Sequence, residues 1–125
     1  MGSNPINLAL RFVLELVALI SFGYWGWNAS SGLVRFALAL GLPLIAALLW
    51  GAFAVPDDPS RSGKAPIPVP GIMRLFLEFD FFALAALAIA DLGSWRLALA
   101  FGAIVILHYI ASYDRVAWLL RQRQG

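Results

Sequence analysis

The sequence predicts an all-α, polytopic membrane protein with four transmembrane helices, built as two tandem helical hairpins. Three observations lead to this prediction. First, apolar residues make up 62% of the 125 residues and charged residues 13%, against about 45–50% and about 25% in soluble globular domains. A soluble domain of this size cannot bury so much apolar surface, so the excess is expected to face lipid. Second, the apolar residues fall into four segments of spanning length, and third, the last two segments resemble the first two.

Each of the four apolar segments is close to the roughly 20 residues that a helix needs to cross the hydrocarbon core. Asn4 and Pro5 provide an N-cap and a first turn for the first segment. The connections "NASSG" and "DLGS" are short, so each pair of segments should form an antiparallel hairpin. The expected spans are residues 6–27, 33–55, 72–90 and 95–117.

A proline-rich linker separates the two hairpins. The stretch "PDDPSRSGKAPIPVPG" holds five of the seven prolines. Because proline fixes its backbone and has no amide hydrogen, the linker should be extended, partly polyproline-like and exposed, with neither strand nor helix. Within one membrane domain, 1–125, the predicted parts are a first hairpin repeat at 5–54, a cytoplasmic linker at 55–70, a second hairpin repeat at 71–118 and a basic tail at 119–125.

The distribution of Lys and Arg predicts the orientation in the membrane. Basic residues favour the cytoplasmic side, and the side shared by the linker and both termini carries more of them than the opposite side, which has Arg35 and Arg96. We therefore expect a protein of the bacterial cytoplasmic (inner) membrane with both termini cytoplasmic. Trp50 and Trp118 are expected in the aromatic belt near that surface. The basic residues counted on the cytoplasmic side are Arg61, Lys64, Arg115, Arg121 and Arg123.

The two hairpins are similar in sequence. "LRFVLEL" at 10–16 corresponds to "MRLFLEF" at 73–79, and "RFALALG" at 35–41 corresponds to "RLALAFG" at 96–102. A repeat of two helices preserves orientation, so the halves should be related by a parallel pseudo-two-fold axis along the membrane normal. Chance similarity between leucine- and alanine-rich helices is the alternative.

Each half also contains a step of two small residues four positions apart, Ala37 with Gly41 and Ala98 with Gly102. Such steps let helix backbones approach closely in lipid. We expect these four helix-packing residues to lie between the hairpins, in preference to a dimer interface.

Six ionisable residues within the predicted spans form the candidate buried polar site. They are Arg11, Glu15, Arg74, Glu78, Asp80 and His108. Charged side chains at the bilayer centre cost about 2.5–3.5 kcal/mol each on insertion scales, so they are expected to be paired or functional.

The arginine and glutamate of each repeat lie four residues apart, on one helix face. Pseudo-symmetry would also allow crossed pairs, Arg11 with Glu78 and Arg74 with Glu15, and would make the two glutamates equally important for stability. A structural clasp is the favoured interpretation, and a ligand or ion site is the alternative.

Asp80 and His108 have no counterpart in the first hairpin, where Val17 and Ala47 take their places. An Asp80–His108 pair would satisfy both side chains. The favoured interpretation is that His108 is a hydrogen-bonded packing residue. The functional alternative is that it belongs to a protonatable relay. One histidine with scattered carboxylates and no cysteine does not suit a metal site. We expect no metal, no cofactor and no enzymatic activity.

Three stretches carry a resemblance to a known family: "LALRFVLELVALISFGYWGW", "LLWGAFAVPDDP" and "VPGIMRLFLEFDFFALAALAI". Over residues 5–115 the chain resembles the YrdB family of small bacterial four-helix membrane proteins. The resemblance implies an inner-membrane protein and brings no activity with it.

These observations leave three functional hypotheses. The leading one is transport or permeation of a small solute or ion through the polar layer in the cytoplasmic half, with a homodimer as the functional unit. The alternative is a non-catalytic structural or accessory subunit of a larger membrane complex. A third hypothesis, based on the aromatic residues, is a lipidic or quinone-like ligand between the hairpins. The lipid bilayer is the one certain partner, and the absence of a basic stripe argues against nucleic acid.

Overall fold

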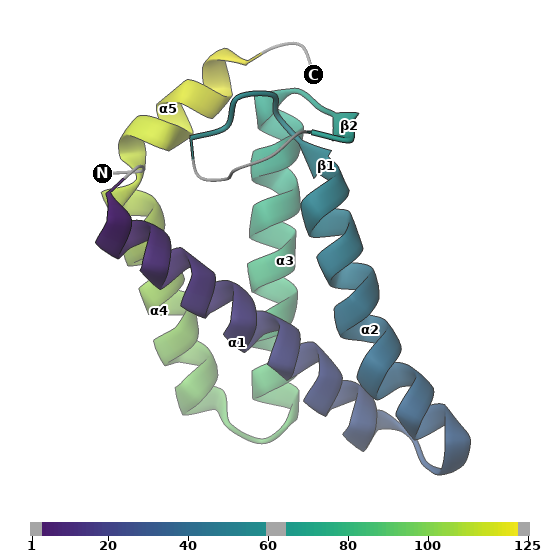
Figure 1. The fold of residues 1–125 in the computed structure, drawn as a ribbon. Coiled ribbons are helices and arrows are strands. Elements are labelled where there is room, and N and C mark those ends of the chain that lie inside the picture. Colours follow the sequence, from purple (N-terminus) through teal and green to yellow (C-terminus); the bar gives the residue numbers. More distant parts are fainter. Residues whose placement is uncertain (1–3, 60–64, 123–125) are drawn as a thin grey trace.

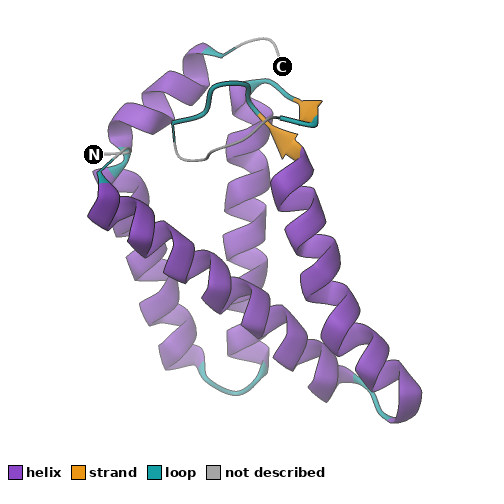
Figure 2. Ribbon diagram, in the orientation of Figure 1, coloured by secondary structure: helices purple, strands orange, loops and turns teal. Residues whose placement is uncertain are grey.

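The computed structural model describes residues 4–59 and 65–122. Over these residues the chain folds into helices joined by short turns, with two very short strands in the linker (Figures 1 and 2). The elements are α1 (Pro5–Ala29), α2 (Gly32–Ala52), β1 (Phe53–Ala54), β2 (Ile67–Pro68), α3 (Gly71–Asp91), α4 (Trp95–Ala111) and α5 (Tyr113–Arg121). The predicted all-α class is confirmed.

Membrane association is supported by helix length and composition. Among the described residues, α1 and α2 are long and apolar enough to cross a membrane, and α4 with α5 adds a third candidate if that bent pair is one broken span. α3 has the length of a span, 21 residues, but contains Arg74, Glu78, Asp80 and Asp91. The predicted count of four spans therefore stays a prediction.

The beginning of α1 agrees with the predicted cap. The side-chain oxygen of Asn4 accepts hydrogen bonds from the backbone amides of Ile6 at 2.9 Å and Asn7 at 3.4 Å, and Pro5 occupies the first turn. These bonds satisfy amide groups that have no partner within the helix. The helix then runs obliquely across α3 and α4 and meets α2 at their shared turn (Figure 1).

Two glycines of α1 let it cross α2 closely. A Cβ atom added at Gly23 would lie 2.9 Å from the carbonyl oxygen of Ala39, and one at Gly26 would lie 2.8 Å from that of Leu38. The "GYWG" stretch therefore supplies the close approach that helices in lipid need.

The predicted packing role of Ala37–Gly41 and Ala98–Gly102 is wrong for three of the four residues. Ala37 is exposed, and a Cβ atom at Gly41 or Gly102 would meet no described atom within 4 Å. Ala98 is buried as predicted. The close approach is achieved by glycines of α1 instead, and Ala37 and Gly41 of α2 face outward.

The predicted fourth span, 95–117, is not one straight helix. α4 ends at Ala111, and α5 begins at Tyr113 at an angle of 70° to it. The bend is anchored at Ser112, whose amide donates to the carbonyl oxygens of His108 and Tyr109 and whose Oγ accepts from the Asn7 side chain at 2.7 Å. Polar contacts at this point interrupt the apolar segment whose length suggested a continuous span.

The expectation that the linker contains no strand is also wrong. β1 and β2 pair in parallel, Phe53 with Ile67 and Ala54 with Pro68, and the Val69 amide donates to the Ala54 carbonyl at 2.9 Å. Ala54, Val55, Asp58 and Val69 are buried, so part of the linker packs into the protein. Arg61, Lys64 and Arg123, and with it the end of the basic tail, lie outside the described residues.

α5 packs on the beginning of α3. The Gly71 amide donates to the Gln122 carbonyl at 2.7 Å, and a Cβ atom at Gly71 would overlap the Leu119 carbonyl group. Only glycine permits this contact. α5, the strands and the beginning of α1 therefore gather at one end of the bundle, which we call the clasp end, and the two helix–helix turns lie at the other, the turn end (Figure 1).

The interior is a small aromatic core. Phe81 and Phe82 stack at 5.2 Å, and the Trp50 ring packs edge-on against Phe81 at 4.3 Å. Many large apolar side chains lie on the outside, such as Leu33 at 87% exposed and Leu40 at 73%. This inverted surface is the one expected of a protein solvated by lipid.

The two hairpins differ in how they are used. α2 has no buried residue, whereas α4 buries five, which are Ala98, Phe101, Val105, His108 and Tyr109. α2 is continuous although it contains Pro43, whereas its counterpart is continued by the bent α5. The parallel pseudo-two-fold repeat therefore stays a prediction.

Candidate functional site: a buried charge cluster

Six charged side chains meet at the clasp end in what we call the charge cluster. It draws on α1, the linker, α3 and α5, and its three arginines balance its three carboxylates. The members are Arg11, Glu15, Asp58, Arg74, Glu78 and Arg115.

Glu78 is the centre of the cluster and is 0% exposed. Its carboxylate accepts from Arg74 Nε at 2.8 Å, from both terminal nitrogens of Arg115 at 2.9 and 2.7 Å, and from the Tyr109 hydroxyl at 2.6 Å. Arg11 Nη2 lies 3.0 Å away. Charge-assisted hydrogen bonds of this kind are stronger than those between neutral groups. They compensate for the hydration that a carboxylate loses when it is buried.

Arg115 joins the cluster to the linker. Its Nε and Nη2 atoms donate to the two carboxylate oxygens of Asp58 at 2.9 and 2.6 Å, a planar two-bond contact. Asp58 is directed inward by a turn in which its amide donates to the Val55 carbonyl. Asp57 in this turn has φ of 66°, a left-handed conformation that aspartate tolerates better than most residues.

Trp50 lies against the cluster, and its predicted place in the aromatic belt stays a prediction. Its indole nitrogen donates to Glu15 at 2.9 Å, and the guanidinium carbons of Arg11 and Arg74 lie 5.2 and 4.4 Å from its ring centre. Arg74 Nη1 also donates to the backbone carbonyls of Trp50 and Phe53 at the end of α2. The "WGAF" stretch thus forms one wall of the site.

The structure brings together four of the six predicted site residues. Both pairs within a helix are present, Arg11–Glu15 at 3.4 Å and Arg74–Glu78 at 2.8 Å, and so is the crossed Arg11–Glu78 pair. The other crossed pair, Arg74–Glu15, is not among the ion pairs of the described residues. Glu15 instead accepts from Trp50.

Asp80 lies outside the cluster, and the expected Asp80–His108 pair is wrong. Asp80 is exposed, while His108 is 2% exposed and faces α1, with its Nδ1 atom 3.0 Å from the side-chain oxygen of Asn7. The cause is helix geometry, because Asp80 is two positions from buried Glu78 and so points to a different face.

His108, Asn7 and Ser112 form a short polar chain beside the charge cluster. The Asn7 amide nitrogen donates to Ser112 Oγ at 2.7 Å, and the Asn7 oxygen lies 3.0 Å from His108 Nδ1, from which an amide oxygen can accept a hydrogen bond. His108 Nε2 and Arg11 Nη1 are buried without a hydrogen-bond partner among the described residues.

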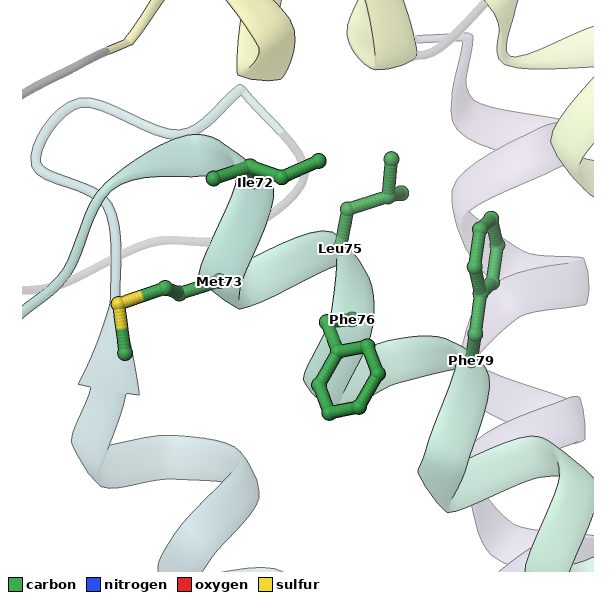
Figure 3. A pocket seen from close by; sticks show the side chains of 5 residues that line it. All are labelled: Ile72, Met73, Leu75, Phe76 and Phe79. Carbon is green, nitrogen blue, oxygen red and sulfur yellow. The ribbon is translucent and has the colours of Figure 1, made fainter.

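The hollows on the surface are separate from these charges. Figure 3 shows one of them, with a volume of about 360 Å³, whose lining side chains all come from α3. They are Ile72, Met73, Leu75, Phe76 and Phe79. This hollow belongs to the apolar exterior and brings no polar group to the cluster.

The arrangement is suited to holding helices together. The charges cancel within a closed unit, and four segments distant in sequence are joined through one carboxylate. Among the described residues no group of three His, Cys, Asp or Glu side chains is placed to hold a metal ion.

Sequence reasoning missed Asp58, Arg115, Tyr109 and Asn7. One signal was present for Arg115, because "SYDR" interrupts the fourth apolar segment with polar residues. Asp58 in "PDDP" offered none, since a linker aspartate is ordinarily solvated.

Comparison with known proteins assigns the chain to a family. The family described as "Protein of unknown function (DUF2568)" matches residues 9–106. The chain is 44% identical over 119 residues to "Uncharacterized protein YrdB" of Bacillus subtilis (strain 168), covering 95% of this chain and 97% of that protein. No solved structure matches significantly. With a match across most of its length, the chain belongs to the DUF2568 family and is a relative of YrdB.

Proposed function

We propose that the protein is a non-catalytic accessory subunit that presents α2 to a transmembrane helix of a larger membrane protein. The observation that carries this proposal is that α2 has the length and composition of a span yet contains no buried residue. A second observation, the closed charge cluster, argues against the transport hypothesis.

The outward face of α2 is suited to helix packing. Leu40, Leu44 and Leu48 are 73%, 60% and 62% exposed, and the Ala37–Gly41 step lies on this same face with nothing against Gly41. Small residues flanked by leucines let a second helix approach closely in lipid, where packing drives association. The predicted packing step thus becomes a candidate contact with another chain.

The charge cluster supports an assembly role. Glu78 is fully buried, and Arg74 and Arg115 are 2% exposed. A permeation path would need polar groups accessible from water, whereas these side chains are engaged with one another. The cluster instead holds α1, α3, α5 and the Trp50 end of α2 as one unit, from which the rest of α2 extends. We place this unit in the bacterial cytoplasmic membrane with the clasp end inside, in keeping with the excess of Lys and Arg on that side.

Site-specific photocrosslinking in intact cells tests the accessory role. A photoreactive amino acid at Leu40 should yield one discrete adduct with another membrane protein. The same group at Leu99, which is similarly exposed on α4 at 64%, should not. Gly41→Ile should abolish the adduct without lowering the melting temperature, because its side chain blocks the approach of a second helix. An adduct of twice the protein's own mass would indicate a homodimer, and lipid adducts alone would contradict the proposal.

Transport remains the second candidate because buried His108 Nε2 and Arg11 Nη1 lack partners. Proteoliposomes containing a pH dye test it directly. Proton movement coupled to a solute, lost in His108→Ala with the fold retained, would favour transport over the accessory role.

A further inference from the structure

A lateral groove lies between α1, α2 and α3 and runs toward the turn end of the bundle. Its volume is about 620 Å³, and its walls are mainly apolar. α1 contributes Phe22 and Trp25, α2 contributes Ile45 and Leu49, and α3 contributes Leu84 and Leu87. Because Leu49 neighbours Trp50 of the cluster wall and Trp25 is near the α1–α2 turn, the groove extends from the clasp toward the turn end.

The groove ends at a polar compartment. A second hollow of about 210 Å³ adjoins it, lined by Asn28, Ala29 and Leu92 and by Trp25 and Asp91, which both hollows share. A long apolar channel leading to a small polar compartment at the end of the helices has the shape of an amphiphile, with a hydrocarbon chain and a headgroup.

The polar compartment carries an uncompensated negative charge. The Asp91 carboxylate accepts one hydrogen bond, from Trp25 Nε1 at 2.7 Å, and no cationic side chain of the described residues pairs with it. The two arginines of the turn end are engaged elsewhere. Arg35 donates to the Trp27 carbonyl at 2.9 Å and lies over its ring, and Arg96 lies over the Trp95 ring.

We propose that this groove binds one membrane aminophospholipid, with an acyl chain between α2 and α3 and its primary ammonium at Asp91. An ammonium group supplies the charge and the hydrogen-bond donors that the free carboxylate oxygen lacks. An anionic headgroup would be repelled by Asp91, and an uncharged isoprenoid would leave the carboxylate unpaired. The site does not depend on the accessory role, since it uses the face of α2 turned toward α3.

Native mass spectrometry of the purified protein with defined lipids tests this site. Phosphatidylethanolamine should be retained in preference to phosphatidylglycerol of the same acyl chains. Asp91→Asn keeps an oxygen to accept from Trp25 but removes the charge, and should reduce that preference roughly two- to fivefold, as expected for one partly exposed ion pair. Leu87→Trp should reduce retention of both lipids by filling the groove. The matched control Leu97→Trp should not, because Leu97 is an exposed residue of α4 outside the groove.

A second measurement uses the wild-type protein. Phosphatidylethanolamine with brominated chains should quench tryptophan fluorescence more than brominated phosphatidylglycerol, and the difference should disappear in Trp25→Phe. Equal retention of the two lipids by the wild type, or an unchanged preference in a folded Asp91→Asn variant, overturns the proposal. So does equal loss of retention in Leu87→Trp and Leu97→Trp.

Discussion

The clasp end and the turn end of this bundle are held together by different interactions. At the clasp end, α1, α3, α4 and α5 converge on the buried carboxylate of Glu78. At the turn end, α1 and α2 touch through the backbone at Gly23 and Gly26, and a lateral groove separates α2 from α3. Charge joins the segments at one end, whereas backbone proximity and covalent turns join them at the other.

The difference follows from the physics of helices in lipid. Burial of apolar surface from water no longer drives helix association there, so packing and polar contacts must do so. Ion pairs can connect segments that no short turn joins, such as α5 and the linker. Each buried charge must then have a partner, because an unpaired buried charge is strongly destabilising. Glycine contacts need no charges but join only two helices, which leaves room for a groove. The comparison predicts a rigid clasp end and a turn end able to accept lipid.

The largest expected effect concerns which end faces the cytoplasm. From the excess of Lys and Arg at the clasp end, we expect this end to face the cytoplasm. A reporter that is active only outside the cytoplasmic membrane should be silent when fused after Gly125 and active when inserted in "NASSG". The expected difference in reporter activity is all-or-none. The reverse pattern would show that the clasp end faces away from the cytoplasm.

The sequence predicted the helices and part of the clasp end because those features are local. Helix length, the Asn4 cap and the i,i+4 ion pairs depend on neighbouring residues, and such signals are readable in one sequence. The Arg11–Glu78 pair was also predictable, because the repeat suggested that α1 and α3 lie together.

The rest of the clasp could not be predicted because it depends on contacts between distant segments. Arg115 reaches Glu78 only because α4 stops at Ala111 and α5 turns by 70°. Asp58 reaches Arg115 only because a linker rich in proline folds inward. The repeat also suggested a packing role for Gly41 that the structure does not show. Gly41 lies on α2, which is at the edge of the bundle and has no buried residue.

Glu78→Gln should produce the largest loss of stability. The change removes the negative charge that three arginines share and leaves the buried cluster with a net positive charge. Breaking a buried ion pair typically costs about 3–5 kcal/mol. Thermal unfolding in detergent should show this loss, and Asp80→Asn, an exposed carboxylate on the same helix, is the matched control. A loss no larger than that of Asp80→Asn would contradict the clasp.

Gly71→Ala tests the contact between α5 and α3. The added methyl group overlaps the Leu119 carbonyl, so α5 must shift, at a cost of about 1–3 kcal/mol typical of overpacking. Gly102→Ala makes the same change where a Cβ atom meets no described atom, and it should be neutral or slightly stabilising because alanine favours helix. Equal melting temperatures for the two variants would show that α5 is not fixed to α3.

The smallest expected effect is that of Glu15→Gln, and it tests the symmetry of the clasp. A symmetric clasp predicts equal losses for Glu15→Gln and Glu78→Gln. The structure makes the two sites unequal. The Glu15 side chain is 21% exposed, and its ion pair with Arg11 is long at 3.4 Å. In the variant, the glutamine oxygen can still accept the hydrogen bond from Trp50. Arg11 retains Glu78 as its partner at 3.0 Å, so no charge is left isolated. We expect a loss of about 0.5–1 kcal/mol, the range of a partly screened ion pair. Unfolding of both variants in the same detergent measures the ratio of the two stability losses. Losses of similar size would support a pseudo-symmetric clasp and contradict the central role of Glu78.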